Sequence, residues 1–309
     1  MRICIKYLLL FGFIFSHPIK PLLAQPMETP IQGCTIKSDN IEKGFSIIKE
    51  FSNPEGCTFE HTFSHNSVDY LLNVDLYADE NPNSKIEVIN TNNNQKYTFE
   101  LPVFVWVTAL DIHFLNLYHK NKPSLVIDYS HSSQGTGGCY TDITFYDASL
   151  PSGYDKVSAE QVNLGDSEGA IRTCFEYEDI DGDGIVEVLG HDFRFGYKFS
   201  SGAGSGLPKK VMKLKSNGLV DVSKNYKGFL RKQASDFWKN VLYESRAQSY
   251  YYYGQMAGYM AVKSLLGEYK EAKSLVNKRI QADGQRNTTE AKEFLSEIDS
   301  FLRKTKYLK

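Results

Sequence analysis

The hydrophobic pattern of this chain changes its period once, near residue 226, and that change limits the folds open to it. Before it, short apolar runs alternate with turn residues, which is typical of β-strands. After it, apolar residues recur every three or four positions, as on the buried face of a helix. We therefore predict an α+β protein with an all-β domain, either sandwich-like or a partial propeller, over residues 25–225 and a small helical module over residues 226–309.

Two β-hairpins are predicted within the β-rich part. Residues 86–89 and 97–101 are strand-like and flank an asparagine-rich turn. Residues 211–214 and 219–222 flank a Ser-Asn-Gly sequence, which favours a tight turn between antiparallel strands. Each pair should form neighbouring strands of one sheet.

A further strand is predicted where aromatic residues occupy every second position, since alternate side chains of a strand lie on one face. The four residues are Phe193, Phe195, Tyr197 and Phe199. The glycine clusters at 135–138 and 202–206 predict flexible loops between strands. Neither cluster ends in the Lys-Ser/Thr pair of a phosphate-binding loop.

The helical module has two clear apolar stripes and one start signal. Asn287 followed by Glu290 forms a capping pair that predicts the start of the last helix. The same asparagine begins an Asn-Thr-Thr glycosylation acceptor, an alternative we consider weaker. The stripes consist of Leu230, Ala234, Phe237, Trp238 and Val241, and of Phe294, Leu295, Ile298, Phe301 and Leu302.

Residues 1–24 have the features of a secretory signal. Arg2 and Lys6 precede or flank an apolar run over residues 7–16, and Ala24 offers a small residue for cleavage. The run is roughly ten residues long, too short to cross a bilayer as a helix. We expect a periplasmic or secreted protein without a transmembrane segment.

The cysteine count agrees with export. Of the five cysteines, Cys4 lies in the signal, and an even number in an exported chain favours disulfides over metal thiolates. Three pairings are open, and proximity favours Cys34 with Cys57 and Cys139 with Cys174. Acylation of Cys34 in a lipoprotein-like box is the alternative, which the preceding Gln-Gly fits poorly.

Charge divides the chain in two. Residues 226–309 hold 16 Lys and Arg against 9 Asp and Glu, so they carry +7 within a chain whose formal charge is −2. A basic helical surface could meet anionic lipid, polysaccharide or nucleic acid. Because the basic residues are scattered, we interpret them as a solvated helix surface and expect no specific nucleic-acid partner.

One segment, Asp-Ile-Asp-Gly-Asp-Gly-Ile-Val-Glu, has the composition of a calcium loop. Its aspartates stand two residues apart, and its glycines allow the positive φ angles that curl a backbone around an ion. Calcium takes six to eight oxygen ligands, including backbone carbonyls. The predicted ligands are Asp179, Asp181, Asp183, the carbonyl of Ile185, and Glu187.

The flanking sequence distinguishes between loop types. An EF-hand needs a bidentate Glu at position twelve, where this chain has Gly190. The motif instead resembles the FG-GAP repeat of integrin-type propellers and its bacterial VCBS relatives, whose blades carry this loop in a β-hairpin. The resemblance implies a structural Ca²⁺ rather than a sensor or catalytic metal. A segment around Asp111 and Asp128 resembles a second unit that lacks the aspartates.

The helices offer a second resemblance. Residues 250–266 and 273–280 are joined by a Gly-x-Tyr turn and a small Ala272, as in a single tetratricopeptide-type unit. One unit cannot stack into a solenoid, so we expect a local helical hairpin. The four tyrosines at 250–253 span more than one helix face, which predicts exposure of some of them or contact with the β domain.

The sequence favours a binding protein over an enzyme. It has no Gly-x-Ser-x-Gly or His-Glu-x-x-His motif. His61 and His65 on one strand face could hold a metal, and His191 next to Asp192 could act as a base. We expect a non-enzymatic, calcium-stabilised module that binds an unidentified protein or glycan, with oligomeric state open. The alternative is a secreted hydrolase of an extracellular glycan, which a His- or carboxylate-lined cleft would favour.

Overall fold

The computed structural model describes twelve stretches of the chain. They are residues 34–40, 44–49, 57–65, 68–76, 85–100, 107–120, 122–132, 139–150, 153–158, 175–215, 218–246 and 252–309; in several strands only the backbone is described. The predicted signal over residues 1–24 lies outside them.

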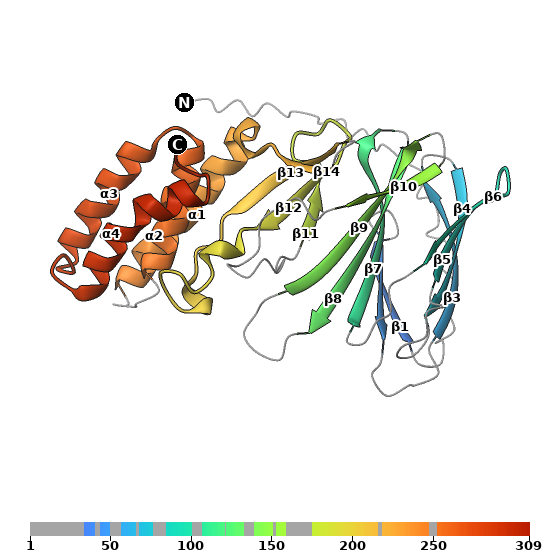
Figure 1. The fold of residues 1–309 in the computed structure, drawn as a ribbon, viewed down its shortest axis with the longest axis horizontal. Helices are drawn as coiled ribbons and strands as arrows, with labels where there is room; N and C mark the ends of the chain where they lie inside the picture. The colour runs from blue at the N-terminus through green and yellow to red at the C-terminus, as the bar shows by residue number, and fades with distance from the viewer. Residues whose placement is uncertain are drawn as a thin grey trace, which may run out of the picture. The chain divides into compact units, whose positions relative to one another are not determined.

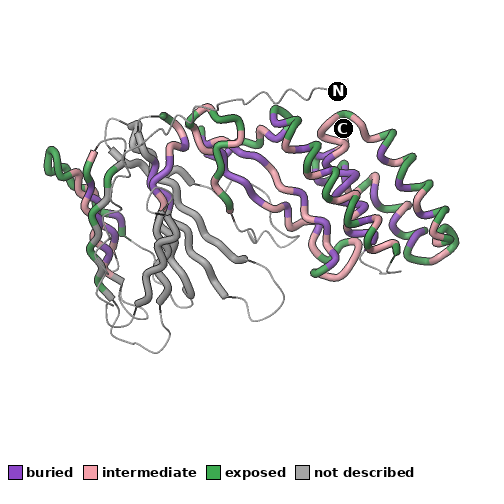
Figure 2. The backbone as a smooth tube through the Cα atoms, turned by 180° about the vertical axis from the view of Figure 1, so that it is seen from behind, coloured by how far each residue is buried: buried purple, intermediate pink, exposed green. Residues whose placement is uncertain are grey.

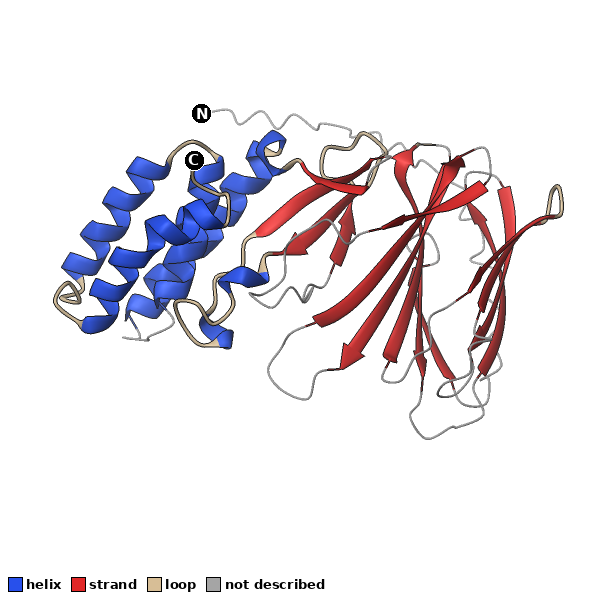
Figure 3. Ribbon diagram, in the orientation of Figure 1, coloured by secondary structure: helices blue, strands red, loops and turns tan. Residues whose placement is uncertain are grey.

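The described strands form three antiparallel sheets, coloured red in Figure 3. In spatial order, the first contains β1 (Cys34–Asn40), β2 (Gly44–Lys49), β7 (Val107–His119), β8 (Lys122–Ser132), β9 (Cys139–Leu150) and β10 (Gly153–Ser158). The second contains β3 (Cys57–His65), β4 (Val68–Leu76), β5 (Lys85–Asn90) and β6 (Gln95–Glu100). The third contains β11 (Phe175–Glu178), β12 (Glu187–His191), β13 (Lys209–Lys215) and β14 (Gly218–Asp221).

Both predicted hairpins are confirmed. Strands β5 and β6 pair from Lys85 with Glu100 to Asn90 with Gln95, around a turn over residues 91–94. Strands β13 and β14 pair up to Lys215 with Gly218, where Gly218 has a φ of 110° that favours glycine. Because successive side chains of a strand point to opposite faces, one face of the second sheet is buried. Its buried residues include Leu72, Val74, Ile86 and Val88.

Four helices follow the sheets, so the α+β class is confirmed (Figure 1). They are α1 (Lys227–Arg246), α2 (Tyr252–Leu265), α3 (Tyr269–Ala282) and α4 (Thr289–Lys304). Both predicted apolar stripes lie in their shared core, and Figure 2 shows buried and exposed residues alternating along the helices. Among the described residues, no helix is both long and apolar enough to cross a membrane.

The N-cap of the last helix lies one residue after the predicted one. Thr288 is the N-cap, and its hydroxyl accepts a hydrogen bond of 3.2 Å from the backbone N–H of Ala291. Thr288 has the extended backbone that an N-cap needs. The prediction of Asn287 as the cap was therefore wrong. Asn and Thr are both favoured at N-caps, so residue type alone did not distinguish Asn287 from Thr288.

The predicted aromatic strand was also wrong. Its first three residues, Phe193–Phe195, form the 3-10 helix η1, and the Asp192 carboxylate caps it by accepting a backbone hydrogen bond. Tyr197 has a φ of 57°, which a strand does not contain. Phe199 packs edge-on against Phe301 of α4, with ring centroids 5.2 Å apart. Spacing alone did not reveal that these rings serve the helical core.

The third sheet has two different faces. On one face, Val188 and Met212 pack with Leu117 of β7 and Val126 of β8. On the other, Leu189 and Val211 pack with Tyr226, just before α1, and with Phe229 in its first turn. Phe195, which precedes residue 226, also belongs to the core around the helices. The domain boundary at residue 226 therefore stays a prediction.

Close backbone contact joins α2 to the glycine cluster at 202–206. Part of that cluster forms the 3-10 helix η2 (Gly202–Gly204), which was predicted as a flexible loop. A Cβ at Gly254 would lie 2.3 Å from the Gly204 carbonyl oxygen, and a Cβ at Gly206 would lie 2.4 Å from the Gly254 carbonyl oxygen. Only glycine permits this approach, so the cluster is a packing site.

We predict that Gly254→Ala lowers the free energy of unfolding by about 1–3 kcal/mol, because its methyl group overlaps backbone atoms. Gly228→Ala in α1 is the matched control, since a Cβ there meets no atom within 4 Å. Urea unfolding followed by circular dichroism measures both. Equal stability of the two variants would contradict the packing argument.

Candidate metal centre

The acidic loop connects two strands of a β-hairpin, as predicted. Glu178 at the end of β11 pairs with Glu187 at the start of β12, which leaves residues 179–186 to form the connection. Gly182 and Gly184 have φ angles of 71° and 81°, a region that glycine enters without steric cost. The loop therefore curls where its sequence provides glycine.

Carboxylates and backbone N–H groups hold the loop in this shape. The two oxygens of Asp179 accept hydrogen bonds from the N–H groups of Asp183, at 3.0 Å, and Gly184, at 2.9 Å. Asp183 accepts one of 2.7 Å from the N–H of Ile185, and this hydrogen bond lowers the pKa of the Asp183 carboxyl. Local sequence thus determines the loop.

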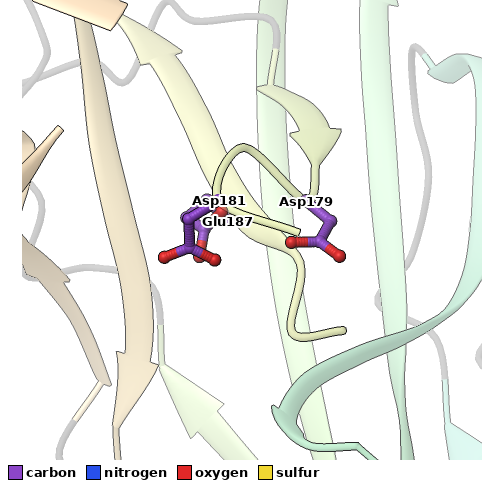
Figure 4. Close-up of side chains that lie close together, drawn as sticks. All are labelled: Asp179, Asp181 and Glu187. Carbon is purple, nitrogen blue, oxygen red and sulfur yellow. The ribbon is translucent and has the colours of Figure 1, made fainter. Parts of the chain in front are cut away.

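Three of the five predicted ligands lie close together. One carboxylate oxygen each from Asp179, Asp181 and Glu187 lie within 4.8 Å of one another. Figure 4 shows Asp181 and Glu187 side by side, with Asp179 across the loop from them. Asp183 is not part of this group, and the observed contact of Ile185 is through its N–H rather than its carbonyl.

Glu187 is fully buried, and several groups compensate its charge. One oxygen accepts a hydrogen bond of 2.9 Å from the N–H of Ile180. The other lies 2.9 Å from the Tyr226 hydroxyl and 2.9 Å from the Lys213 ammonium. A buried carboxylate needs such partners, because its removal from water is costly.

Lys213 contacts the other acidic residues of the loop as well. Its ammonium lies 3.6 Å from Asp181 and 3.5 Å from Asp183. Burial lowers its pKa, but hydrogen bonds with Tyr226 and Glu187 outweigh burial, so the pKa of Lys213 lies above its usual value. Lys213 is thus an internal counter-ion for the loop.

Lys213 and Tyr226 were not predicted as site residues, because they lie far from the loop along the chain. Val188 pairs with Met212, so the next residues outward, Glu187 and Lys213, lie opposite each other on β12 and β13. This register is a tertiary property. The only local signal was a lysine between the apolar residues of β13.

The structure gives Asp192 other partners than a catalytic histidine. Asp192 is fully buried, and Arg194 binds its carboxylate through two nitrogens. The Tyr307 hydroxyl donates a hydrogen bond of 3.1 Å to the same carboxylate, and burial raises the pKa of Tyr307 well above its usual value. This cluster attaches the C-terminal segment to β12 and is structural.

His191 instead lines a cleft of about 340 Å³ between the third sheet and α1. Its Nε2 lies 3.8 Å from Glu176 of β11, and its Nδ1 lies 3.4 Å from the Leu207 carbonyl oxygen. The other wall comes from residues 229–240 of α1. The cleft size is at the lower end of the range for small-molecule sites, about 300–1,000 Å³.

Several predicted residues fall outside the described side chains. This applies to His61 and His65 in β3, to Asp111 and Asp128, which pair across β7 and β8, and to residues 250–251. It also applies to the cysteines, so both disulfides remain predictions: Cys34 lies in β1, Cys57 in β3 and Cys139 in β9, and Cys174 lies outside the described chain. Tyr252 and Tyr253 are buried, so these two form no exposed aromatic patch.

Similarity to known proteins covers a minor part of the chain. No protein-family model matches it, and no solved structure matches it. A probable thylakoid lumen protein of Synechocystis sp. is 37% identical over 95 residues, which are 30% of this chain and 28% of that protein. The chain thus spans less than a third of that relative's length.

We predict that Tyr226→Phe destabilises the protein by about 1–3 kcal/mol, because the buried Glu187 carboxylate loses a hydrogen-bond donor. The control is Tyr243→Phe, whose ring is 70% exposed and whose loss of a hydroxyl should change stability by less than about 0.5 kcal/mol. Urea unfolding separates the two. A Tyr226→Phe variant as stable as the control would show that the hydroxyl does not compensate Glu187.

Proposed function

We propose that this chain is an exported, non-enzymatic binding protein whose acidic hairpin loop holds one structural Ca²⁺. The proposal rests on the convergence of oxygens from Asp179, Asp181 and Glu187 within 4.8 Å. Oxygens bound to one calcium ion at its usual distance are at most about 5.2 Å apart, whereas those around magnesium are at most about 4.2 Å apart. Three oxygens within 4.8 Å of one another could surround one calcium ion.

The remaining ligands are proposed from the loop sequence. Asp183 and the carbonyl oxygen of Ile185 would complete an oxygen shell with the three convergent carboxylates. All of these groups belong to one hairpin: four lie in its turn, and Glu187 is the first residue of β12. A site built in this way by the protein alone leaves little space for substrate, which supports a structural role.

Lys213 bears directly on this proposal, because its ammonium already contacts three of the proposed ligands. Calcium and the ammonium would compete for the same negative charge. Lys213 would therefore keep the loop folded without the ion and weaken calcium binding. Calcium would then add stability to a hairpin that is already formed, in contrast to a zinc finger that unfolds without metal.

Export is supported by two observations. The first is the signal-like segment at residues 1–24. The second is the partial similarity to a probable thylakoid lumen protein, which lies outside the cytoplasm. Together these observations support an extracytoplasmic or lumenal protein. We propose a periplasmic or secreted location. We also propose that the hairpin is related to FG-GAP/VCBS repeats and that α2 and α3 are related to a tetratricopeptide unit.

The hydrolase alternative receives partial support from the cleft. Glycan hydrolysis needs one carboxyl group kept protonated and a second one ionised. In the cleft, however, both oxygens of Glu176 lie 2.6 Å from the Lys209 ammonium, so this carboxylate is already held in an ion pair. Glu178 and Asp236 also line the cleft. Because Lys209 engages Glu176, we favour binding over hydrolysis.

We predict that chelation with EDTA lowers the melting temperature and that Asp181→Ala abolishes this difference. Saturating calcium at one hundred times its Kd adds about 2.7 kcal/mol to stability. Differential scanning calorimetry with EDTA or calcium measures the effect. Glu293→Ala, which removes an exposed carboxylate of α4, is the control and should respond to calcium as the unaltered protein does.

Two results would contradict the proposal. One is a melting temperature of the unaltered protein that is the same in EDTA and in calcium. The other is a calcium response that persists in Asp181→Ala, because the ion would then bind elsewhere.

A further inference from the structure

Strand β6 ends the second sheet and has the features of an edge that can accept another strand. It pairs with β5 along its whole length without a register shift. Among the described strands, β5 is its one neighbour, and Figure 1 shows the two strands side by side. An edge strand of this kind directs a row of backbone N–H and C=O groups away from its own sheet.

Most other edges of the described sheets are interrupted or short, which are two ways in which proteins prevent strand pairing. In the first sheet, β1 and β10 both have register shifts. In the third sheet, β11 and β14 contain four residues each. Strand β6 has neither form of protection and contains no proline. On its inner face Tyr97 and Phe99 lie opposite the buried Val88 and Ile86, so no charge on that face prevents pairing.

The outer face of this sheet carries charges of alternating sign. Lys85 of β5 stands in register between Asp75 of β4 and Glu100 of β6, and its ammonium lies 3.5 Å from the Asp75 carboxylate. Glu87 forms ion pairs with Lys85 at 3.1 Å and with Lys96 of β6 at 2.7 Å. Glu100 is exposed at the edge and has no ion-pair partner among the described residues. The row of charges therefore ends on a carboxylate that a further cation could pair with.

The sequence of β6 is complementary to itself in one register. A twofold axis perpendicular to the sheet makes two β6 strands antiparallel and keeps their outer faces on one side. Centred on Thr98, the pairing places Lys96 of each copy opposite Glu100 of the other, and Thr98 opposite Thr98. Centred on Tyr97, it places Lys96 opposite Thr98 and Glu100 opposite the turn residue Asn94. The first register is favoured, because opposite charges and Thr–Thr pairs stabilise cross-strand contacts.

We propose that β6 is the interface of a symmetric dimer, in which two copies of this chain join their four-stranded second sheets into one continuous sheet. Backbone groups of the two edges supply the hydrogen bonds, as in other complexes formed by strand addition. The two contacts between Lys96 and Glu100 select the register. The exposed ammonium of Lys96 has three N–H donors, so it can contact Glu100 of the second copy and keep its ion pair with Glu87.

Strand β3, at the other edge of the second sheet, fits a symmetric pairing less well. It is regular along its pairing with β4. However, it contains no lysine or arginine that could lie opposite Glu60 of a second copy. Charge complementarity therefore favours β6 over β3 as the contact between two copies.

The proposed interface is small, so the dimer should be weak. In the favoured register, residues 96–100 of each copy overlap. Interfaces below about 1,200 Å² are typical of transient complexes, and we expect a dissociation constant on the order of 10 μM. The proposal does not depend on calcium, because the acidic loop belongs to the third sheet.

Sedimentation velocity of the purified protein in EDTA, from roughly 1 to 200 μM, tests the dimer across the expected constant. We expect monomers that become dimers as the concentration rises. Lys96→Glu and Glu100→Lys should each weaken dimerisation about tenfold or more, because each substitution places like charges opposite each other. An equimolar mixture of the two variants should dimerise again, since every contact between unlike copies then joins opposite charges.

Lys278→Glu and Glu293→Lys are the matched controls, because they make the same charge changes at exposed positions of α3 and α4. Both should dimerise as the unaltered protein does. Circular dichroism and the melting temperature confirm that each variant is folded, and recovery in the mixture cannot come from unfolded chains.

Four results would overturn the proposal. The protein could remain monomeric over the whole range, the two edge variants could dimerise as readily as the unaltered protein, or their mixture could remain monomeric. Assemblies larger than a dimer would indicate pairing of unlike edges, such as β6 with β3, which does not close into a symmetric pair.

Discussion

The arrangement of the third sheet depends on one buried charge, the carboxylate of Glu187. This residue has no exposed surface, yet it begins a strand directly after a loop of acidic residues. An unpaired carboxylate in that position would cost several kcal/mol. The Lys213 ammonium and the Tyr226 hydroxyl, both 2.9 Å away, compensate it. Because these partners belong to β13 and to the segment before α1, the charge can be buried only when loop, sheet and first helix are assembled together.

A second buried carboxylate completes the connection between sheet and helices. Asp192, just after β12, binds Arg194 and the hydroxyl of Tyr307, close to the C-terminus. The two ends of β12 are therefore fixed by different networks, one to the start of the helical layer and one to its end. Between them, Gly254 and Gly206 allow backbone contact between α2 and the segment after η1. Polar networks of this kind specify an arrangement more than they add net stability.

The sequence predicted the features that depend on local pattern. The stripe from Leu230 to Val241 identified α1, because helical periodicity is a property of neighbouring residues. The acidic loop was placed correctly in a hairpin through its glycines and the strand after it. The strand predicted from the aromatic spacing around Phe195 was wrong, because a spacing of two residues can also occur in a 3-10 helix followed by a turn. Lys213 was missed because strand register, which places it opposite Glu187, is decided by the assembled sheet.

The most direct test of this account is a double-mutant cycle with Glu187→Gln and Lys213→Met, measured by urea unfolding in EDTA. If the two residues form the pair on which the third sheet depends, each single variant should lose about 3–5 kcal/mol, since it leaves one charge without its partner. The double variant should then recover most of that loss, because both charges are removed together. Additive losses, with a coupling energy within about 0.5 kcal/mol of zero, would show that the pair is incidental and contradict the account.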